Sequence, residues 1–341
     1  MKLIKTTEAV GHILCQDMTQ IIRGVTKDAR FRKGHVVTEQ DIPVLLSMGK
    51  DFLYIWEKQE GMLHEDEGAR MLCDLCKNSW MKESSIKEGK IELSSEIDGL
   101  FCVDVQRLDA INSLGELMIA TRSNHQPVCK GDKLAGMRVI PLTIAQQKLQ
   151  QAQELAGGQP LLRVLPYQKK KCGIVTTGNE VFYGRIEDTF SPVVAEKLQA
   201  FGGEILGITL CGDQPEQITA AIHAFFAQGA QLVVCTGGMS VDPDDRTPAA
   251  IRRSGAQVVS YGAPVLPGAM FLLSYLDGKP VIGLPGCAMY AKRTIFDLVL
   301  PRLMADVPVT AADLARLGNG GLCLSCESCH FPNCGFGKGC V

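Results

Sequence analysis

The 341-residue sequence lacks a charge surplus, a long apolar run and an apolar core near its start. Lys and Arg number 35 against 37 Asp and Glu, which gives a net charge of −2, and no long basic run occurs. This balance argues against nucleic acid or an anionic membrane as the main partner. No apolar run approaches the roughly 18–20 residues of a membrane span, and residues 1–17 have no signal-peptide core. We therefore expect a cytoplasmic protein without a nucleic-acid or membrane partner.

Cysteine, by contrast, is abundant. Of the 14 cysteines, nine are scattered along the chain and five fall in the last 19 residues. In a reducing compartment, thiols are more often metal ligands or buried apolar groups than disulfides. The clustering at the end of the chain therefore needs an explanation of its own.

The first half of the sequence predicts two small modules. Residues 1–58 read as an α+β module, with an extended segment at 31–37, a helix at 38–49 and a strand at 51–56. Thr38 and Asp41 have the spacing of a capping box at the start of that helix. Residues 59–160 predict a mixed helical and β module that ends in a helical linker at 146–160.

The second half changes to a regular alternation of apolar strands and helical segments over residues 165–308. Two of the helical segments carry start signals, Ser191 before Pro192 and Asp213 with Glu216 at capping-box spacing. Such alternation implies parallel strand pairing with helices on both faces of the sheet. We therefore predict an α/β fold with a doubly wound, mostly parallel sheet, preceded by the smaller modules and followed by a Cys-rich tail at 319–341.

Three strands of this half end in unusual turns, "TTGNE" (176–180), "TGGMSVDPDD" (236–245) and "GLPG" (283–286). In open parallel sheets, ligands bind beyond the carboxyl ends of the strands, and glycines let backbone N–H groups approach an anion. Hydroxyl donors to a phosphate are available at Thr176, Thr177, Thr236 and Ser240. The carboxylates of Asp242, Asp244 and Asp245 would repel a phosphate unless a cation such as Mg²⁺ bridges them.

Each of these turns and carboxylates also has a purely structural interpretation. A glycine turn after a strand is common in any fold. Asp188 and Asp245 each precede a helix, where a carboxylate faces free N–H groups. Three such turns at the end of strands in one sheet favour a ligand site over coincidence.

These turns match the motifs of a known family. "TTGNE", with Gly178, matches its T-G-x-E turn, "TGGMSVDPDDRTP" matches T-G-G-x-S-V-x-x-x-D-x-T in register, and "GLPGCAMY" matches G-L-P-G-N-P. On these motifs, residues 171–304 resemble the molybdopterin-binding domain shared by MogA, MoeA and gephyrin. The first half resembles, more weakly, the N-terminal region of longer molybdopterin-binding proteins.

The resemblance implies a ligand, molybdopterin, and a set of site residues. MogA-like enzymes adenylylate the terminal phosphate of molybdopterin with Mg-ATP, and MoeA-like enzymes use the adenylylated pterin and insert molybdate. Asp188 and Asp245 match the two functionally important carboxylates of the family. The ligand-binding positions that match are Glu180, Gly237, Gly238, Ser240, Gly283, Pro285 and Gly286. Family members are often dimers or trimers, which implies a homo-oligomer.

The sequence also departs from the family pattern. Phe190 replaces a polar Asn after Asp188, and Cys287 replaces the Asn of the third loop. Leu266 and Ala269 stand where MoeA-like members have lysines. Without two cations, the charge stabilisation of a reaction between anions is weaker. We therefore expect molybdopterin binding to survive better than molybdate insertion.

The tail "CLSCESCHFPNCGFGKGC" predicts a metal site. Two successive C-x-x-C spacings bring three thiolates, those of Cys323, Cys326 and Cys329, to adjacent corners of a [4Fe–4S] cluster, with Cys334 or Cys340 as the fourth ligand. Zinc held by four thiolates, or by three with His330, fits the same residues. A tail without a metal is the remaining alternative.

Three functions follow as hypotheses. The first is a molybdopterin-binding enzyme of molybdenum-cofactor biosynthesis that transfers an adenylyl group or molybdate, with Asp188 and Asp245 essential. The second is a non-catalytic carrier or sensor that binds the finished cofactor and docks to a molybdoenzyme through its metal-bearing tail. The third is a nucleotide hydrolase on the same fold, as in CinA-like relatives.

Overall fold

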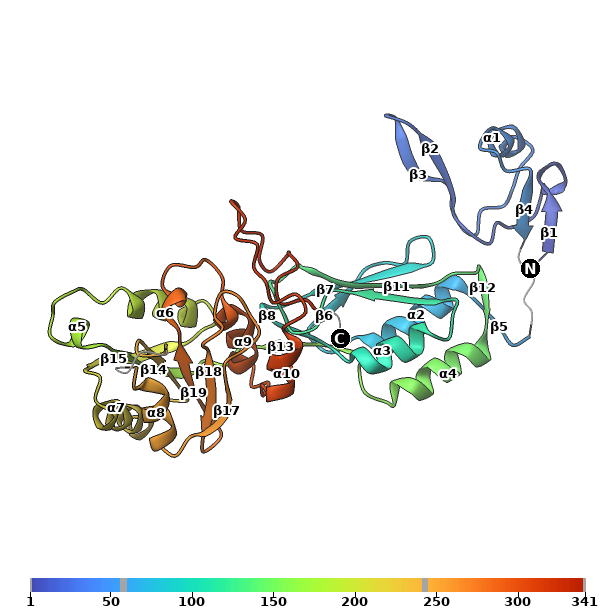
Figure 1. Ribbon diagram of the computed structural model, residues 1–341. Coiled ribbons are helices and arrows are strands. Elements are labelled where there is room, and N and C mark those ends of the chain that lie inside the picture. Colours follow the sequence, from blue (N-terminus) through green and yellow to red (C-terminus); the bar gives the residue numbers. More distant parts are fainter. Residues whose placement is uncertain (1, 56–59, 241–244, 340–341) are drawn as a thin grey trace. The chain divides into compact units, whose positions relative to one another are not determined.

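The computed structural model describes residues 2–55, 60–240 and 245–339, which form two compact units (Figure 1). Unit 1 comprises Met1–Ser94, Asp104–Thr121 and Lys133–Leu161. Unit 2 comprises Ser95–Val103, Arg122–Asp132 and Leu162–Val341. None of the described helices is long and apolar enough to span a membrane.

Unit 1 combines short antiparallel sheets with helices. Its largest sheet has the order β6-β7-β11-β9, and α2 packs against β11 while α3 packs against α4. The strands are β1 (Lys2–Lys5), β2 (Met18–Ile22), β3 (Thr26–Phe31), β4 (Phe52–Ile55), β5 (Met62–His64), β6 (Met81–Glu83), β7 (Lys90–Ser95), β9 (Leu117–Thr121), β11 (Lys133–Val139) and β12 (Thr143–Ala145). The helices are η1 (Thr6–Glu8), α1 (Asp41–Ser47), α2 (Glu65–Cys76), α3 (Val105–Asn112) and α4 (Gln146–Ala156).

Several predicted elements of unit 1 are present with shifted ends. Helix α1 starts at Asp41, whose carboxylate accepts the backbone N–H of Thr38 at 2.8 Å. In the segment 31–37, expected to be extended, Phe31 ends strand β3 and Val36 forms an isolated antiparallel bridge with Ile13. Helix α4 was predicted as a linker, but it buries Leu149 and Ala152 and packs on α3, so it is a structural part of unit 1.

Unit 2 is built on a six-stranded mixed sheet of order β15-β14-β16-β19-β18-β17. The strands are β14 (Lys171–Thr177), β15 (Glu204–Cys211), β16 (Leu232–Thr236), β17 (Gln257–Tyr261), β18 (Leu272–Leu276) and β19 (Lys279–Leu284). The pairings β15-β14, β14-β16 and β16-β19 are parallel. The pairings β19-β18 and β18-β17 are antiparallel.

The antiparallel pairings make this sheet mixed: β18 runs against the other five strands, so the predicted doubly wound, mostly parallel sheet is found only in part. Strands β18 and β19 form a hairpin, and its turn residues Asp277 and Gly278 have φ values of 49° and 76°. Two positive φ angles in a two-residue loop match the right-handed twist of the strands it joins. The hairpin reverses the chain direction, so β17 pairs antiparallel with β18.

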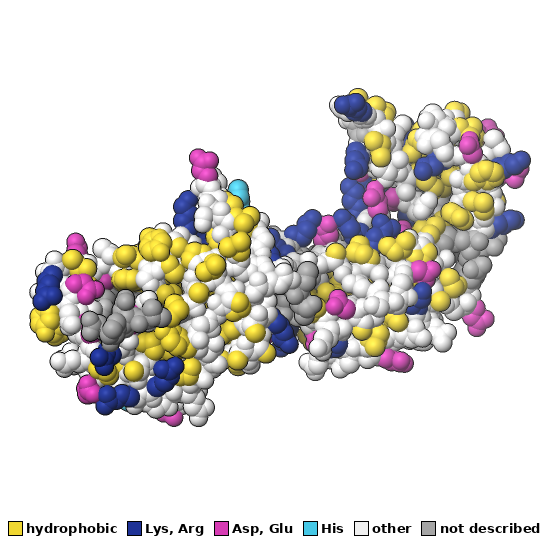
Figure 2. Space-filling view, in the orientation of Figure 1, with side chains coloured by type: hydrophobic (Ala, Val, Ile, Leu, Met, Phe, Trp, Pro, Cys, Tyr) yellow, Lys and Arg dark blue, Asp and Glu magenta, His cyan; other side chains and the backbone are white. Residues whose placement is uncertain are grey.

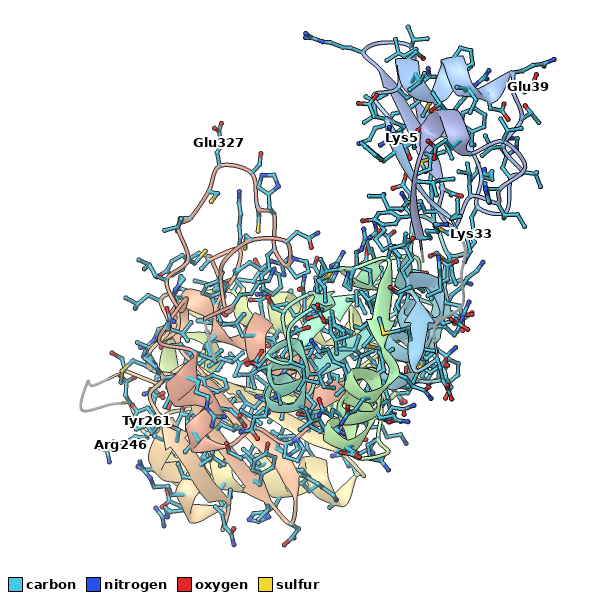
Figure 3. All side chains as sticks on the ribbon, turned by 90° about the vertical axis from the view of Figure 1, so that its right-hand side faces the viewer. Lys5, Lys33, Glu39, Arg246, Tyr261 and Glu327 are labelled. Atoms are coloured by element: carbon cyan, nitrogen blue, oxygen red, sulfur yellow. The ribbon has the colours of Figure 1, made fainter. Side chains whose placement is uncertain are left out.

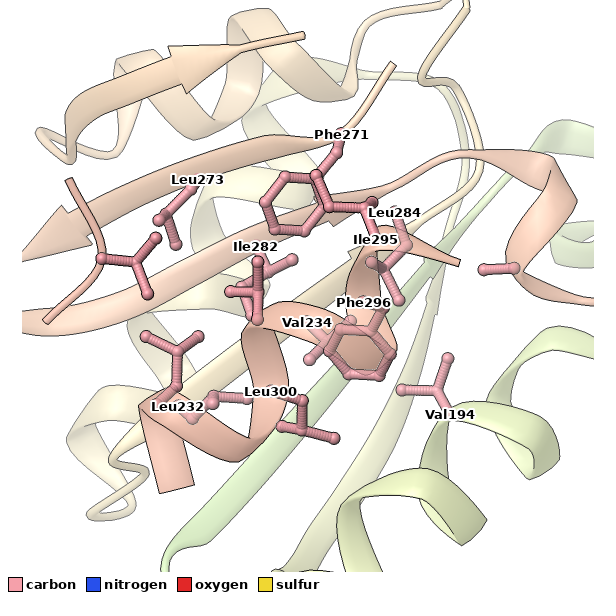
Figure 4. Packing of buried hydrophobic residues seen from close by; sticks show 14 of the residues in the cluster. Val194, Leu232, Val234, Phe271, Leu273, Ile282, Leu284, Ile295, Phe296 and Leu300 are labelled. Carbon is pink, nitrogen blue, oxygen red and sulfur yellow. The ribbon is translucent and has the colours of Figure 1, made fainter. Parts of the chain in front are cut away.

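Helices cover both faces of this sheet. They are α5 (Asn179–Phe182), α6 (Phe190–Gln199), α7 (Pro215–Ala227), α8 (Thr247–Arg253), η2 (Gly286–Ala288), α9 (Ile295–Met304) and α10 (Ala311–Arg316). Alternate residues of β16 point to opposite faces: Leu232 and Val234 join the core under α6 and α9, drawn in Figure 4, whereas Val233 and Cys235 join the core under α7 and α8. The two cores fix the sheet as a rigid base for the loops at its edges.

A second, three-stranded sheet and the Cys-rich tail complete unit 2. The sheet has the order β10-β8-β13, from β8 (Gly99–Val103), β10 (Gln126–Val128) and β13 (Leu162–Pro166). Residues 319–339 of the tail form no helix or strand, and Leu322 makes an isolated parallel bridge with Leu266.

Candidate functional site

Four loops of unit 2 meet at one edge of its main sheet. The parallel strands β14, β16 and β19 all end there, so the loops 178–189, 237–246 and 285–294 leave from the same edge. The register of the antiparallel end pairs Tyr261 with Leu272 and Leu272 with Gly283. Loop 262–271 therefore lies at this edge as well. The three turns singled out in the sequence do converge on one part of the molecule.

The threonines at the strand ends form hydroxyl hydrogen bonds beneath the loops of this edge. The Thr236 hydroxyl donates to Thr176 Oγ1 at 3.2 Å, and Thr176 Oγ1 lies 2.6 Å from Ser191 Oγ on α6. Thr177 Oγ1 lies 3.0 Å from Thr247 Oγ1 at the start of α8. All five side chains are buried. In this structure the hydroxyls of Thr176, Thr177 and Thr236 hold strands and helices together beneath the loops.

The second loop turns on two glycines that no other residue would replace without strain. Gly237 and Gly238 have φ values of 82° and 53°. A Cβ atom on Gly237 would lie 2.1 Å from the carbonyl oxygen of Thr177, and one on Gly238 would lie 2.9 Å from Thr247 Oγ1. The Thr247 hydroxyl also donates to the Gly237 carbonyl at 2.9 Å. The turn is therefore packed directly onto the end of β14.

The first loop begins with another conformationally special glycine. Gly178 has a φ of 136°, and a Cβ atom there would lie 2.6 Å from Glu180 Oε1. The Glu180 side chain is exposed and folds back over this turn. The backbone N–H of Asn179 donates to the Asp213 carboxylate at 3.1 Å, so Asp213 links this loop to the end of β15. The sequence position of Asp213 had suggested a cap for α7, but that helix follows Gln214 without a side-chain cap.

Asp188 caps helix α6. Its Oδ1 accepts the backbone N–H groups of Phe190 at 2.9 Å and Ser191 at 3.1 Å. The sequence had assigned this capping role to Ser191, whose hydroxyl instead bonds to Thr176. Asp188 is half-buried, so its carboxylate can cap the helix and still face the edge of the sheet. The structural role weighed for Asp188 is observed, and it leaves a charge-based role open to test.

Asp245 lies beside Tyr261, the last residue of β17. Burial and the nearby charge of Asp245 raise the pKa of the Tyr261 hydroxyl, with Arg252 acting against them. That hydroxyl donates to the carbonyl oxygens of Met239 at 3.3 Å and Ser240 at 3.5 Å. Figure 3 shows Tyr261 and Arg246 on the same side of unit 2. Asp242 and Asp244 lie outside the described residues.

The third loop packs against the other two. A Cβ atom on Gly283 would lie 2.5 Å from the Met239 side chain. The lack of a side chain at Gly283 therefore lets the second loop pack over β19. Pro285 leads into the exposed Gly286, where a Cβ atom would lie 3.9 Å from the ring of Phe190. The predicted site residues Gly283, Pro285 and Gly286 thus lie beside the first and second loops.

The fourth loop carries no cation at the two positions noted in the sequence. Leu266 is 57% exposed and Ala269 is also exposed. The nearby cations Lys197 and Arg293 are both bonded to the buried Asp297, at 2.6 and 2.8 Å. The two cations thus share one carboxylate, and the group as a whole keeps a positive charge.

The tail packs against the third and fourth loops. The Cys323 N–H donates to the Leu266 carbonyl at 2.8 Å, and Lys292 Nζ donates to the Glu327 carbonyl at 3.0 Å. The thiols of Cys323 and Cys334 are half-buried, whereas those of Cys326 and Cys329 are exposed. The Phe331 N–H and the Arg293 guanidinium lower the pKa of the Cys329 thiol. Cys340 lies outside the described residues.

No metal site is preformed in the part of the chain that the structure describes: no three His, Cys, Asp or Glu side chains lie close enough together to hold one ion. The other C-x-x-C pair, Cys73 and Cys76, is fully buried in helix α2, where burial raises the pKa of both thiols. Those two cysteines are core residues of unit 1.

Three residues of the edge were missed in the sequence. Tyr261 and Met239 look like ordinary strand and loop residues. Tyr261 ends β17, which runs in the same direction as β19, and its hydroxyl donates to the Met239 carbonyl. Asp297 carried a readable signal, because Thr294 and Asp297 form a capping box at the start of α9, with the Thr294 N–H donating to Asp297 at 2.8 Å.

Comparison with known proteins matches this unit to a described family. Residues 173–305 match the family model described as a probable molybdopterin binding domain, and residues 3–57 match a domain of unknown function (DUF8806). A molybdopterin molybdenumtransferase of Synechococcus elongatus is 28% identical over 195 residues, 48% of this chain and 48% of that protein. A CinA-like protein of Mycobacterium sp. (strain MCS) is 41% identical over 83 residues, 24% of this chain and 20% of that protein. The chain thus spans between a fifth and a half of these relatives.

Among solved structures, the molybdopterin biosynthesis enzyme MoaB of Thermus thermophilus aligns with a TM-score of 0.36 at 22% identity, over 42% of this chain and 97% of that one.

Proposed function

We propose that this chain, whose residues 173–305 belong to the molybdopterin-binding domain family of cofactor biosynthesis, binds molybdopterin at the loop edge of unit 2. The observation that carries the proposal is the convergence of loops 178–189, 237–246 and 285–294 at one edge of the sheet. All three lie within the matched residues. Ligands of open α/β sheets bind at this kind of edge.

The second loop would receive the terminal phosphate of the pterin. Its glycines present backbone N–H groups without side chains in the way, and the exposed Ser240 adds a hydroxyl donor. The buried hydroxyl network of Thr177 and Thr247 holds the turn in place before the ligand arrives. A site that is ordered in advance loses less conformational entropy on binding.

Asp245 would act at the same phosphate through Mg²⁺. A single carboxylate suits this ion, because Mg²⁺ is usually held by one or two carboxylates together with phosphates and water. With ATP bound, a pterin phosphate oxygen would attack the α-phosphorus of ATP. One P–O bond then forms, the bond to the β-phosphate breaks, and pyrophosphate leaves. Mg²⁺ would supply the charge neutralisation that this transfer between anions requires.

A carrier function is the second candidate, and the fourth loop favours it. With Leu266 and Ala269 at two exposed positions, this loop offers no positive charge to molybdate or to a second phosphate. The protein would then bind finished cofactor in the cytoplasm and pass it to a molybdoenzyme. The metal predicted for the cysteine tail, an iron–sulfur cluster or zinc, has no assigned step in pterin binding.

The test is a titration of the anaerobically purified full chain with molybdopterin, first alone and then with Mg-ATP. Asp245→Asn removes the proposed metal ligand, and Asp277→Asn, in the hairpin turn at the opposite edge of the sheet, is the matched control. Binding with pyrophosphate release that falls at least tenfold in Asp245→Asn alone supports adenylyl transfer. Binding without turnover supports the carrier, and adding molybdate with adenylylated pterin tests the insertion step. Nucleotide hydrolysis without pterin binding would contradict the proposal and favour the nucleotide hydrolase.

A further inference from the structure

The cysteines of the tail surround one cavity. Cys323, Cys326, Cys329 and Cys334, together with His330, line a space of about 260 Å³ within unit 2. The spacing of the first three, two residues between neighbours, lets each thiolate reach a different point of one bound group. Four cysteines that line one space are an unusual use of this residue, and no disulfide joins these four.

The segment that carries these cysteines is a closed loop with fixed ends. The Gly337 N–H donates to the Gly320 carbonyl at 3.0 Å, so all four described cysteines lie inside the loop 320–337. At its start, the Leu266 N–H donates to the Gly321 carbonyl at 2.8 Å. On the other side, Gln126 Nε2 donates to the Pro332 carbonyl at 3.0 Å. The cysteines are therefore positioned by the folded unit.

The walls of the cavity are mostly apolar and include two cations. The rings of Phe331 and Phe336 meet edge to face with their centroids 6.3 Å apart, and the Arg293 guanidinium lies 5.0 Å from the centre of the Phe331 ring. Lys292 is the second cation. No Asp or Glu is among the described lining residues. Figure 2 shows hydrophobic side chains gathered around the base of the tail. This environment suits an anionic group, and a metal centre held by four thiolates carries net negative charge.

The size of the cavity distinguishes a cluster from a single ion. Zinc in a structural site draws four ligands to about 2.0–2.3 Å from one point. In a four-iron cluster each thiolate binds its own iron atom, so the sulfurs stay apart around a larger core. The four cysteines line a space of about 260 Å³, which suits the larger core of a cluster better than a single ion.

We propose that the loop 320–337 holds a [4Fe–4S] cluster whose ligands are the thiolates of Cys323, Cys326, Cys329 and Cys334. The cluster would lie against the third and fourth loops of the pterin edge, through Lys292 and Leu266. This assignment goes beyond the proposed function and does not depend on it, because it rests on residues outside the glycine turns.

The experiment measures iron, acid-labile sulfide and zinc in the full chain purified without oxygen and reconstituted with ferrous iron and sulfide, with zinc alone in a parallel arm. The variant Cys326→Ser/Cys329→Ser removes two exposed ligands, so it should fold normally, and far-ultraviolet circular dichroism checks this. The control is Cys129→Ser, an exposed cysteine outside the tail.

We expect about four iron and four sulfide per chain, with the visible absorption of a cluster, in wild type and in the control. The double variant should lose at least three quarters of both elements. One zinc per chain without sulfide would overturn the assignment in favour of a mononuclear site. Absence of any metal, or iron retained fully in the folded double variant, would also overturn it.

Discussion

The close packing of the glycine turn onto β14 predicts a specific response to one added methyl group. In Gly237→Ala the new Cβ would lie 2.1 Å from the Thr177 carbonyl oxygen, in a residue with a φ of 82°. Since real contacts of this kind are not shorter than 3.0 Å, the turn and the strand end must separate by at least 0.9 Å. Gly229→Ala is the matched control, because Gly229 has a φ of 91° with no atom within 4 Å of its added Cβ.

A comparison of the two variants separates the part of the lost stability that comes from backbone strain from the part that comes from steric overlap. The positive φ alone costs an alanine about 1–2 kcal/mol, which both variants share. Forced movement of a packed backbone adds about 1–3 kcal/mol to Gly237→Ala only. We therefore expect a loss of unfolding free energy of about 2–5 kcal/mol for Gly237→Ala and about 1–2 kcal/mol for Gly229→Ala.

Amide hydrogen exchange read by mass spectrometry on peptides from β14 and β16 is the appropriate assay. It reports on unit 2 separately, whereas both tryptophans of the chain precede residue 95. Molybdopterin affinity should fall at least tenfold in Gly237→Ala and stay within twofold of wild type in Gly229→Ala. Equal destabilisation of the two variants, with unchanged affinity, would refute the close packing of this turn and its part in binding.

Three further predictions concern charge in unit 2. Asp188→Asn keeps an oxygen that can cap α6, so its melting temperature should stay nearly unchanged. Asp188→Ala loses the cap and should cost about 0.5–2 kcal/mol in thermal unfolding. If the carboxylate charge is needed for the reaction, pyrophosphate release should fall in both variants. Asp297→Ala leaves Lys197 and Arg293 without their shared carboxylate and should cost about 2–4 kcal/mol in denaturant unfolding, and a loss under 1 kcal/mol would contradict this network. Burial lowers the pKa of His125 from 6.5 to about 4 in the folded protein. Between these two pH values the unfolded state therefore binds more protons than the folded state. Unit 2 should thus lose stability as the pH falls from about 6.5 through 4, and His125→Gln should flatten that part of the pH profile.

The sequence was most informative where local chemistry decides structure. Strands β14, β16 and β19 end where their apolar runs end, and the glycine turns that follow them converge because parallel strands share an edge. This part of the fold and the position of the candidate site were therefore predictable. The family model over residues 173–305 confirms the resemblance that these turns carried.

The remainder depended on tertiary context. The direction of β18, the one strand of this sheet that runs against the other five, follows from the β18–β19 hairpin. Its Asp277-Gly278 turn was a readable signal that the alternation of strands and helices obscured. The caps of α6 and α7 were assigned to Ser191 and Asp213, yet the first bonds to Thr176 and the second to Asn179. A polar side chain near a helix start can serve either the helix or a neighbouring strand end, and only packing decides between the two.

The most direct test of the central proposal is hydrogen exchange of the full chain with and without bound molybdopterin. We expect protection on binding at residues 236–240 and 283–286 and at the first turn, 176–180, with no change in β2–β3 of unit 1. Binding that protects none of these turns, or that protects only residues of unit 1, would contradict the assignment of the pterin to this edge of the sheet.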